Sequence, residues 1–229
     1  MKPLEIKHRV IGGGEPLICV PVVEQDAQSV IREITYLSQS TADMIEWRVD
    51  AFRDFTDYNA IRSVFEAVAP LLGEKLFLYT FRTAHQGGMA QVKAEQLDDL
   101  HDLAAESGCV DLVDLEFFEE DRPLHKIKRL REMGVSVIAS HHDFEQTPSP
   151  EVMKMLLEKM CAGGADIVKL AVMPQNYKDV LNLLDVTAQV QSASTVTERV
   201  TLQQTICREG TAVLTDRQNL LLQPGESRT

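Results

Sequence analysis

The sequence has no long apolar run and few of the residues that mark exported or metal-binding proteins. Its four cysteines, Cys19, Cys109, Cys161 and Cys207, lie far apart and form no C-x-x-C pair. This spacing argues against a zinc site and a disulfide framework, so we expect buried free thiols. No stretch has the apolar length of a membrane span, and the N-terminal segment MKPLEIKHRVIGGGEP lacks the apolar core of a secretory signal. We therefore expect a cytoplasmic protein without a membrane partner.

Basic residues are also in deficit. The chain has 23 lysines and arginines against 35 aspartates and glutamates, which gives a formal net charge of -12. Such a field repels nucleic acid, and no basic stripe interleaved with aromatic residues occurs, so we expect no nucleic-acid partner. An anionic small molecule gains nothing from this field at a distance and needs individual arginines to hold it.

What the sequence does contain is a repeat of short apolar runs. Six runs rich in β-branched residues are typical of strands, and they occupy residues 17–23, 44–52, 76–82, 110–118, 136–144 and 166–174. Segments with apolar residues at helical spacing separate them, at residues 27–39, 58–72, 96–107, 124–134 and 149–164. Gly134, Gly163 and Gly164 stand where helix C-caps are expected.

The spacing of these runs predicts an α/β fold. Strand starts recur about every thirty residues, the length of a βαβ crossover unit. A (β/α)8 barrel and a doubly wound sheet both fit, but no Gly-rich phosphate-binding fingerprint follows the first strand, so the barrel is favoured. With 229 residues and no linker, we expect one barrel domain over residues 1–229, with an atypical segment at residues 188–229.

One lysine interrupts an apolar strand. Lys169 lies in GGADIVKLAVMP, within a run too continuous for a strand with one wet face. Burial disfavours the ammonium form, and a neutral amine can attack a carbonyl to form a Schiff base. The alternative is that the stem is buried while the ammonium reaches water at the end of the strand.

Charged residues also recur at the ends of the other predicted strands. By alternation, Glu46 and Arg48 share one face of their strand, and Asp114 and Glu116 share one face of theirs. Arg82 ends the strand that lies between these two in sequence. In a barrel, this polar face lines the interior and the loops that follow the strands carry the chemistry. A structural ion-pair network is the alternative for any single pair.

Two histidines precede the lysine strand. His141 and His142 end the strand at residues 136–144, next in sequence to the strand of Lys169. Alone, either one is explained as a hydrogen-bonded histidine at a strand end. Beside a Schiff base, an imidazole can take a proton from the carbon next to the iminium. The combination indicates proton abstraction α to a carbonyl.

Five stretches together resemble one known family. EWRVD at 46–50, TFRTAHQGG at 80–88, VDLVDLEFF at 110–118, SHHDFEQTPS at 140–149 and GADIVKLAVMPQ at 164–175 are similar to type I 3-dehydroquinate dehydratase. The resemblance spans roughly residues 10 to 187, in order and with matching separations, and is more specific than one motif.

This resemblance implies a (β/α)8 barrel in the shikimate pathway that uses neither a metal nor an organic cofactor. It implies that Lys169 forms an imine with the ketone of 3-dehydroquinate, and that His142 is the general base that helps to expel water. Glu46, Arg48 and Arg82 match positions that bind the substrate's hydroxyls and shape the pocket. A homodimer is compatible with the resemblance.

The chain departs from the family in two places. Gln86 stands where members often carry glutamate, which keeps a hydrogen-bonding oxygen but removes a charge. Beyond about residue 187 the family's last strands and its carboxylate-binding arginine have no counterpart, and no motif marks Arg208 or Arg217 as a substitute. We therefore keep a second hypothesis, a catalytically impaired relative that retains ligand binding or an interaction role. An aldolase would need a phosphate-binding loop late in the chain, and none is seen.

Overall fold

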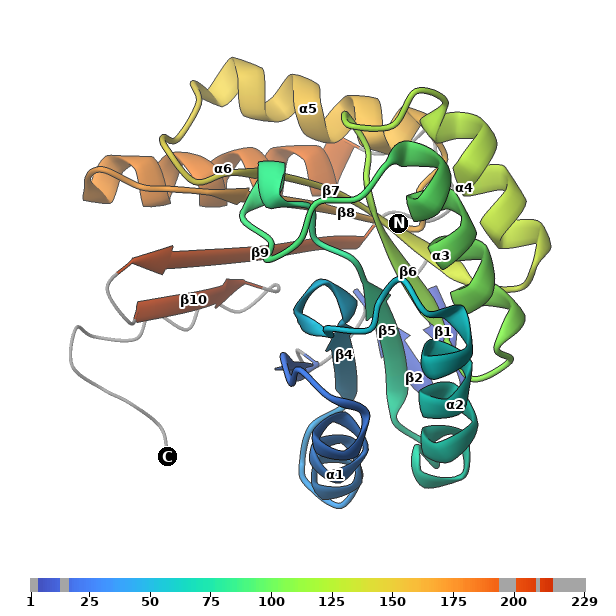
Figure 1. Ribbon diagram of the computed structural model, residues 1–229. Helices are drawn as coiled ribbons and strands as arrows, with labels where there is room; N and C mark the ends of the chain where they lie inside the picture. Colours follow the sequence, from blue (N-terminus) through green and yellow to red (C-terminus); the bar gives the residue numbers. More distant parts are fainter. Residues whose placement is uncertain (1–3, 13–16, 194–200, 209–210, 216–229) are drawn as a thin grey trace. The chain divides into compact units, whose positions relative to one another are not determined.

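The computed structural model describes residues 4–12, 17–193, 201–208 and 211–215 (Figure 1). The chain divides into two compact units. The first unit comprises Glu5–Arg9 and Leu17–Ile138, and the second comprises Met1–Leu4, Val10–Pro16 and Ala139–Thr229.

The first unit is built from parallel strands joined by helices. Its strands are β3 (Cys19–Val22), β4 (Met44–Arg48), β5 (Leu76–Thr80) and β6 (Leu112–Glu116). They pair in parallel in this order, with Met44 opposite Cys19 and Leu76, and Leu78 opposite Leu112. The α-helices are α1 (Ala27–Ser38), α2 (Tyr58–Val68), α3 (Ala94–Glu106) and α4 (Pro123–Glu132). Short 3-10 helices are η1 (Val49–Ala51), η2 (Ala69–Leu71) and η3 (Ala84–Gln86).

An aromatic cluster joins the strands of this unit to its helices. Trp47 on β4 is fully buried and meets Phe65 of α2 edge to face, with ring centroids 5.3 Å apart. Phe65 also meets Phe77 and Tyr79 of β5, and Tyr79 meets His101 of α3. Because Trp47 and Tyr79 alternate with the polar residues of β4 and β5, the cluster uses one face of the strands and leaves the other for the site.

The helix starts follow capping rules. Asp26 precedes α1 and accepts a hydrogen bond from Ser29 N at 2.9 Å. Asp57 precedes α2 and accepts from Asn59 N at 2.9 Å and Ala60 N at 3.3 Å. Each carboxylate binds a backbone N–H that has no partner within the helix.

The second unit contains the end of β7 (Ser136–Asp143) and the strands β8 (Ile167–Val172), β9 (Thr201–Arg208) and β10 (Thr211–Thr215). Its helices are α5 (Pro150–Ala162) and α6 (Tyr177–Ala193). β8 neighbours β7 and pairs in parallel with β9, with Lys169 opposite Gln203. β10 then returns antiparallel along β9, with Thr211 opposite Arg208.

A short ribbon near the N-terminus is formed by β1 (Leu4–Ile6) and β2 (Arg9–Ile11). Lys7 lies in the turn with φ 52°, a left-handed conformation that is uncommon for a residue other than glycine. Its Nζ donates to Lys75 O at 2.7 Å and Asp111 Oδ2 at 2.8 Å. These two bonds hold the turn against the first unit.

The described part confirms the predicted α/β class, and every predicted strand is present. Helices occupy the five predicted segments, and α6 and the β1–β2 ribbon were not predicted. Gly134 and Gly164 have φ of 94° and 86° after their helices, as expected for C-caps. The expectation of one domain over residues 1–229 stays a prediction, and much of the 188–229 segment lies outside the described residues.

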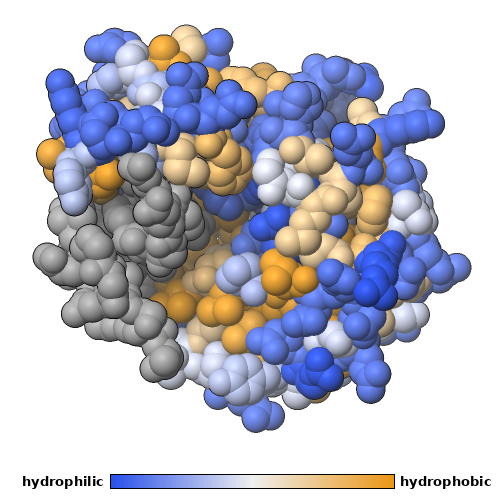
Figure 2. Space-filling view, turned by 60° about the vertical axis from the view of Figure 1, so that its left-hand side comes forward, coloured by the Kyte–Doolittle hydropathy of each residue, from blue (hydrophilic) through white to orange (hydrophobic). Residues whose placement is uncertain are grey.

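Figure 2 shows hydrophilic residues over much of the drawn surface, with hydrophobic residues exposed between them. Cys161 is buried as expected, whereas Cys19 and Cys109 are half-buried, all three are free thiols, and the Cys207 side chain lies outside the described residues. Among the described helices, none combines the length and the apolar character needed to cross a bilayer.

Candidate active site

Two of the predicted site residues lie on β4. Glu46 is half-buried, and its Oε1 accepts a hydrogen bond of 2.7 Å from Thr80 Oγ1 on β5. Arg48 makes a bidentate pair with Asp50, in which Nε and Nη2 each lie 2.8 Å from one carboxylate oxygen. The Asp50 side chain is 0% exposed and that of Arg48 is 22% exposed. Nε and Nη2 of Arg48 thus face Asp50, whereas Nη1, on the outer edge of the guanidinium, is not used by this pair.

Arg82 lies just after β5 and is held by two carboxylates of β6. Its side chain is 4% exposed, with Nη2 at 2.8 Å from Asp114 Oδ2 and Nη1 at 3.0 Å from Glu116 Oε1. Glu116 also accepts from Thr83, at 2.9 Å from the backbone N and 2.7 Å from Oγ1. The predicted shared face of Asp114 and Glu116 is confirmed, because both reach one guanidinium.

Two opposing effects, burial and ion pairing, set the pKa values of the residues in this cluster. Burial acts to lower the pKa of Arg82, but the charges of Asp114 and Glu116 outweigh it and raise the pKa above its ordinary value. Burial raises the pKa of Glu116, although Arg82 and the hydrogen bonds from Thr83 oppose that shift. Arg82 therefore stays charged, and the cluster offers no excess positive charge for an anionic ligand.

The loop at residues 83–93 folds tightly over the end of β5. Gly88 N donates to Thr83 O at 2.8 Å, and Ala84 N donates to Ala90 O at 2.9 Å. A Cβ on Gly88 would lie 1.8 Å from Arg82 O, so this position requires glycine. Gln86 is 2% exposed, and its side-chain amide donates a hydrogen bond from Nε2 to Glu119 Oε1 at 3.4 Å.

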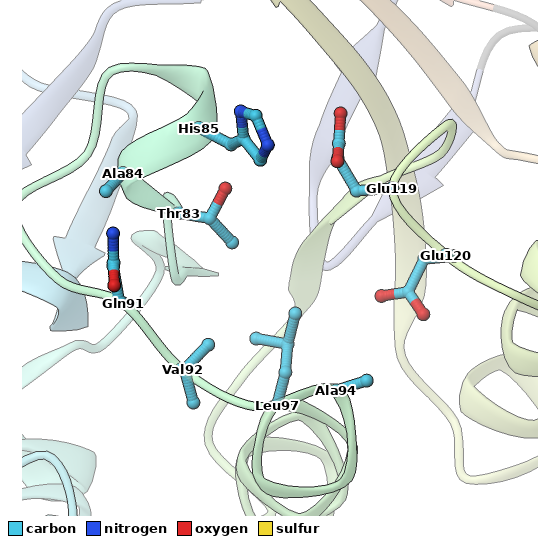
Figure 3. Close-up of a pocket in the computed structure, with 9 residues that line it drawn as sticks. All are labelled: Thr83, Ala84, His85, Gln91, Val92, Ala94, Leu97, Glu119 and Glu120. Atoms are coloured by element: carbon cyan, nitrogen blue, oxygen red, sulfur yellow. The ribbon is translucent and has the colours of Figure 1, made fainter.

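A pocket of about 430 Å³ lies beside this loop (Figure 3). Its walls come from the loop after β5, the start of α3 and the loop after β6, and they consist of Thr83, Ala84, His85, Gln91, Val92, Ala94, Leu97, Glu119 and Glu120. Figure 3 shows His85 and Glu119 facing each other across it, with Leu97 and Val92 on the apolar side. The pocket contains none of the five predicted site residues.

The second unit carries the predicted catalytic pair. Lys169 is half-buried on β8, between the fully buried Val168 and Leu170. Solvent reaches part of its side chain, which is compatible with both alternatives kept from the sequence. His142 is half-buried on β7, the strand beside β8, and stacks on Phe144 with ring centroids 5.9 Å apart.

Backbone and side-chain bonds join the ends of these two strands. Thr147 Oγ1 donates to Met173 O at 2.9 Å, and Met173 N donates to Gln146 O at 3.2 Å. Asp143 Oδ1 accepts from Glu145 N and Gln146 N, each at 3.0 Å, which turns the chain directly after β7. The loop after β7 is therefore fixed to the end of β8, and His142 and Lys169 lie on neighbouring strands.

The structure thus groups the predicted residues in two sets. Glu46, Arg48 and Arg82 belong to the first unit, where Asp50 links the two arginines, and His142 and Lys169 belong to the second unit. Asp50 was not predicted as a site residue. Its signal was present in EWRVD, where an aspartate two residues after an arginine is a candidate ion-pair partner. Arg208 and Arg217 lie outside the described side chains.

The chemistry available in each set differs. The first unit offers paired guanidinium and carboxylate groups that suit hydroxyl groups better than a carboxylate, and the second offers a nucleophilic amine and an imidazole. In the described part of the chain, no three histidine, cysteine or acidic side chains are arranged to hold a metal ion.

Known sequences match the chain over most of its length. The profile of the Type I 3-dehydroquinase family matches residues 18–204. The 3-dehydroquinate dehydratase of Syntrophotalea carbinolica is 39% identical over 188 residues, which cover 82% of this chain and 74% of the relative. That of Listeria monocytogenes serotype 4a is 38% identical over 191 residues, which cover 83% of this chain and 76% of the relative.

Solved structures agree. The 3-dehydroquinate dehydratase of Geobacillus kaustophilus superposes with a TM-score of 0.85 at 30% identity, covering 90% of this chain and 79% of that one. The type I enzyme of Clostridium difficile, solved with covalently modified comenic acid, gives a TM-score of 0.83 at 32% identity, covering 88% of this chain and 80% of that one.

Proposed function

This chain belongs to the type I 3-dehydroquinase family, and we propose from that premise how its own residues carry out the family's reaction. The family consists of hydro-lyases, and the reaction is the dehydration of 3-dehydroquinate to 3-dehydroshikimate in the shikimate pathway. The proposal assigns covalent catalysis to Lys169 and proton transfer to His142. It assigns substrate binding to Glu46, Arg48 and Arg82.

The reaction begins with the Lys169 amine. Its lone pair attacks the C3 ketone of the substrate, and loss of one water leaves an iminium. His142 then removes a proton from C2, and the electron pair flows into the iminium to form an enamine. The enamine expels the C1 hydroxyl, which takes a proton from His142 and leaves as water. Hydrolysis of the product imine releases 3-dehydroshikimate and restores the free amine.

The position of Lys169 is the observation that carries this proposal. It is the half-buried residue of a strand whose other members are buried, so its amine can meet a ligand while its stem stays fixed. The neighbouring strand carries His142 near its end. The hydrogen bonds from Met173 N to Gln146 O and from Thr147 Oγ1 to Met173 O hold those two strand ends together. The covalent ligand of the Clostridium difficile relative supports a nucleophile in this fold.

The residues of the first unit are assigned to binding. The pair with Asp50 uses Nε and Nη2 of Arg48, so Nη1 supplies two further N–H donors for a substrate hydroxyl. The carboxylate of Glu46 accepts from Thr80 through one oxygen, and its other oxygen suits a second hydroxyl. Arg82 is enclosed by Asp114 and Glu116, which supports a role in shaping the pocket more than in direct contact.

Borohydride trapping tests the catalytic assignment. With 3-dehydroquinate present, reduction should add the ligand mass to the peptide that contains Lys169. Lys169→Ala should give neither trapping nor turnover, because it has no amine. His142→Ala should still be trapped but turn over at least about 100-fold more slowly, the usual contribution of a general base.

The outcomes separate the two hypotheses kept from the sequence. Binding without trapping in the unmodified chain would indicate the impaired relative. Normal turnover in Lys169→Ala would refute the Schiff-base assignment, and normal turnover in His142→Ala would refute the proton-transfer role. Turnover is followed by the absorbance of the conjugated product.

A homodimer and a cytoplasmic location remain predictions. The resemblance implies the first, and the composition favours the second. Sedimentation equilibrium of the full chain measures the first, and cell fractionation measures the second.

A further inference from the structure

The carboxylate of Asp50 accepts four hydrogen bonds on the first unit's polar face. Oδ1 accepts from Arg48 Nε at 2.8 Å and from Arg82 N at 3.2 Å. Oδ2 accepts from Arg48 Nη2 at 2.8 Å and from Met89 N at 3.0 Å. A carboxylate has room for about four such bonds, so this one is saturated.

These bonds join three separate segments. Asp50 lies in η1 directly after β4, Arg82 follows β5, and Met89 lies in the loop before α3. The Met89 side chain is 66% exposed, so its backbone N–H holds this part of the loop to the buried carboxylate. Gly88 lets the loop pass close to Arg82 O, which brings the Met89 N–H within reach of Asp50.

The two backbone donors fix the carboxylate, and the carboxylate in turn fixes Arg48. A bidentate pair constrains the plane of a guanidinium as well as its position. The plane of the Arg48 guanidinium is therefore set by Asp50, and with it the direction of the Nη1 donors on the outer edge. A free arginine side chain would sample several rotamers and would have to be ordered by the ligand.

The charge state of Asp50 suits this role. Burial acts to raise its pKa, but the hydrogen bonds and charge of Arg48 and the N–H groups of Met89 and Arg82 outweigh burial and hold the pKa below its ordinary value. The pair is therefore ionised at neutral pH.

We propose that Asp50 is a positioning residue for the reaction, one that aims the Arg48 guanidinium at the substrate without touching it. This inference rests on the proposed function through the assignment of Arg48 to substrate binding. A purely structural role for Asp50 would lower stability without changing the affinity that depends on Arg48.

The test measures 3-dehydroquinate binding by calorimetry in a Lys169→Ala background, so that no imine forms and no turnover is needed. Adding Asp50→Asn should weaken binding about tenfold or more, because asparagine cannot accept both Arg48 bonds and carries no charge. Asp50→Glu should recover part of the affinity, since the charge returns. Asp57→Ala, which removes the α2 cap, is the control and should leave affinity unchanged while lowering Tm.

A double-mutant cycle identifies the route of the effect. In the Lys169→Ala background, Arg48→Ala alone and Arg48→Ala with Asp50→Asn should bind equally weakly if Asp50 acts through Arg48. The inference would be overturned if Asp50→Asn left the affinity unchanged. It would also be overturned if Asp50→Asn lowered the affinity by the same factor with Arg48 present and with Arg48→Ala. Failure of borohydride trapping in the unmodified chain would count against the proposed catalytic roles instead. The binding measurement in the Lys169→Ala background would still test the role of Asp50, because it does not depend on imine formation.

Discussion

A buried histidine makes the stability of this fold depend on pH. His101 on α3 is 1% exposed and meets Tyr79 edge to face at 6.2 Å, and neither ring nitrogen has a hydrogen-bond partner in the described part of the chain. Burial lowers its pKa from 6.5 to about 4, with Asp114 opposing the shift and Arg82 adding to it. The folded protein therefore holds this ring neutral at a pH where the unfolded chain protonates it.

The sign and size of the effect follow from proton linkage. Between pH 6.5 and pH 4 the unfolded state binds a proton that the folded state does not, so the free energy of unfolding falls as the pH falls. The contribution is fully present above pH 6.5 and is lost progressively toward pH 4. At pH 5 the loss from this one group is about 2 kcal/mol, taking 1.36 kcal/mol for each unit of pKa difference.

Replacing the imidazole isolates this contribution. His101→Phe keeps an aromatic ring beside Tyr79 and removes two buried nitrogens, so it should be at least as stable as the unmodified chain at pH 7.5. Between pH 7.5 and pH 5.0 the unmodified chain should lose about 2 kcal/mol more than the variant does. Urea unfolding followed by the fluorescence of Trp47, the chain's single and fully buried tryptophan, measures both values. Equal losses in the two proteins would refute the neutral, buried imidazole.

Two further substitutions test the polar face of the first unit. Gly88→Ala places a Cβ 1.8 Å from Arg82 O, so the loop must move. We expect the free energy of unfolding, measured with urea, to fall by about 1–3 kcal/mol, and kcat/KM, measured by steady-state kinetics, to fall about 100-fold. Unaltered values would contradict the tight packing. Arg82→Met leaves Asp114 and Glu116 buried without their cation, so the free energy of unfolding should fall by about 3–5 kcal/mol. Adding Glu116→Gln should recover part of this loss. If Arg82→Met alone stays within about 1 kcal/mol of the unmodified chain, the three residues are not energetically coupled.

Most of the architecture could be predicted because its signals are local. The strands of a parallel sheet are largely apolar, and β5 and β8 are recognisable in the sequence as nearly continuous apolar runs. α6 was missed because its buried stripe is narrow and includes a polar member, Thr187. The β1–β2 ribbon was missed because its turn depends on Lys7, a residue without the usual turn chemistry.

The site was predictable where residue type alone carried the chemistry. A lysine in an apolar strand and a histidine at a strand end could be found from the sequence. The sequence left open how far the Lys169 side chain reaches water, because that depends on which neighbours cover it. The role of Asp50 could not be predicted either. Two of its four bonds come from the backbone of Arg82 and Met89, and a backbone N–H leaves no mark in the residue pattern.

The enclosure of Arg82 between Asp114 and Glu116 limits how this family can drift at these positions. Losing the guanidinium alone leaves two buried carboxylates without a cation. Losing either carboxylate alone removes one of the two ion pairs that hold the buried guanidinium. Neutral divergence here has to proceed by paired exchanges. Among homologous chains, these three positions should therefore covary, with an apolar residue at position 82 accompanied by an uncharged one at position 114 or 116.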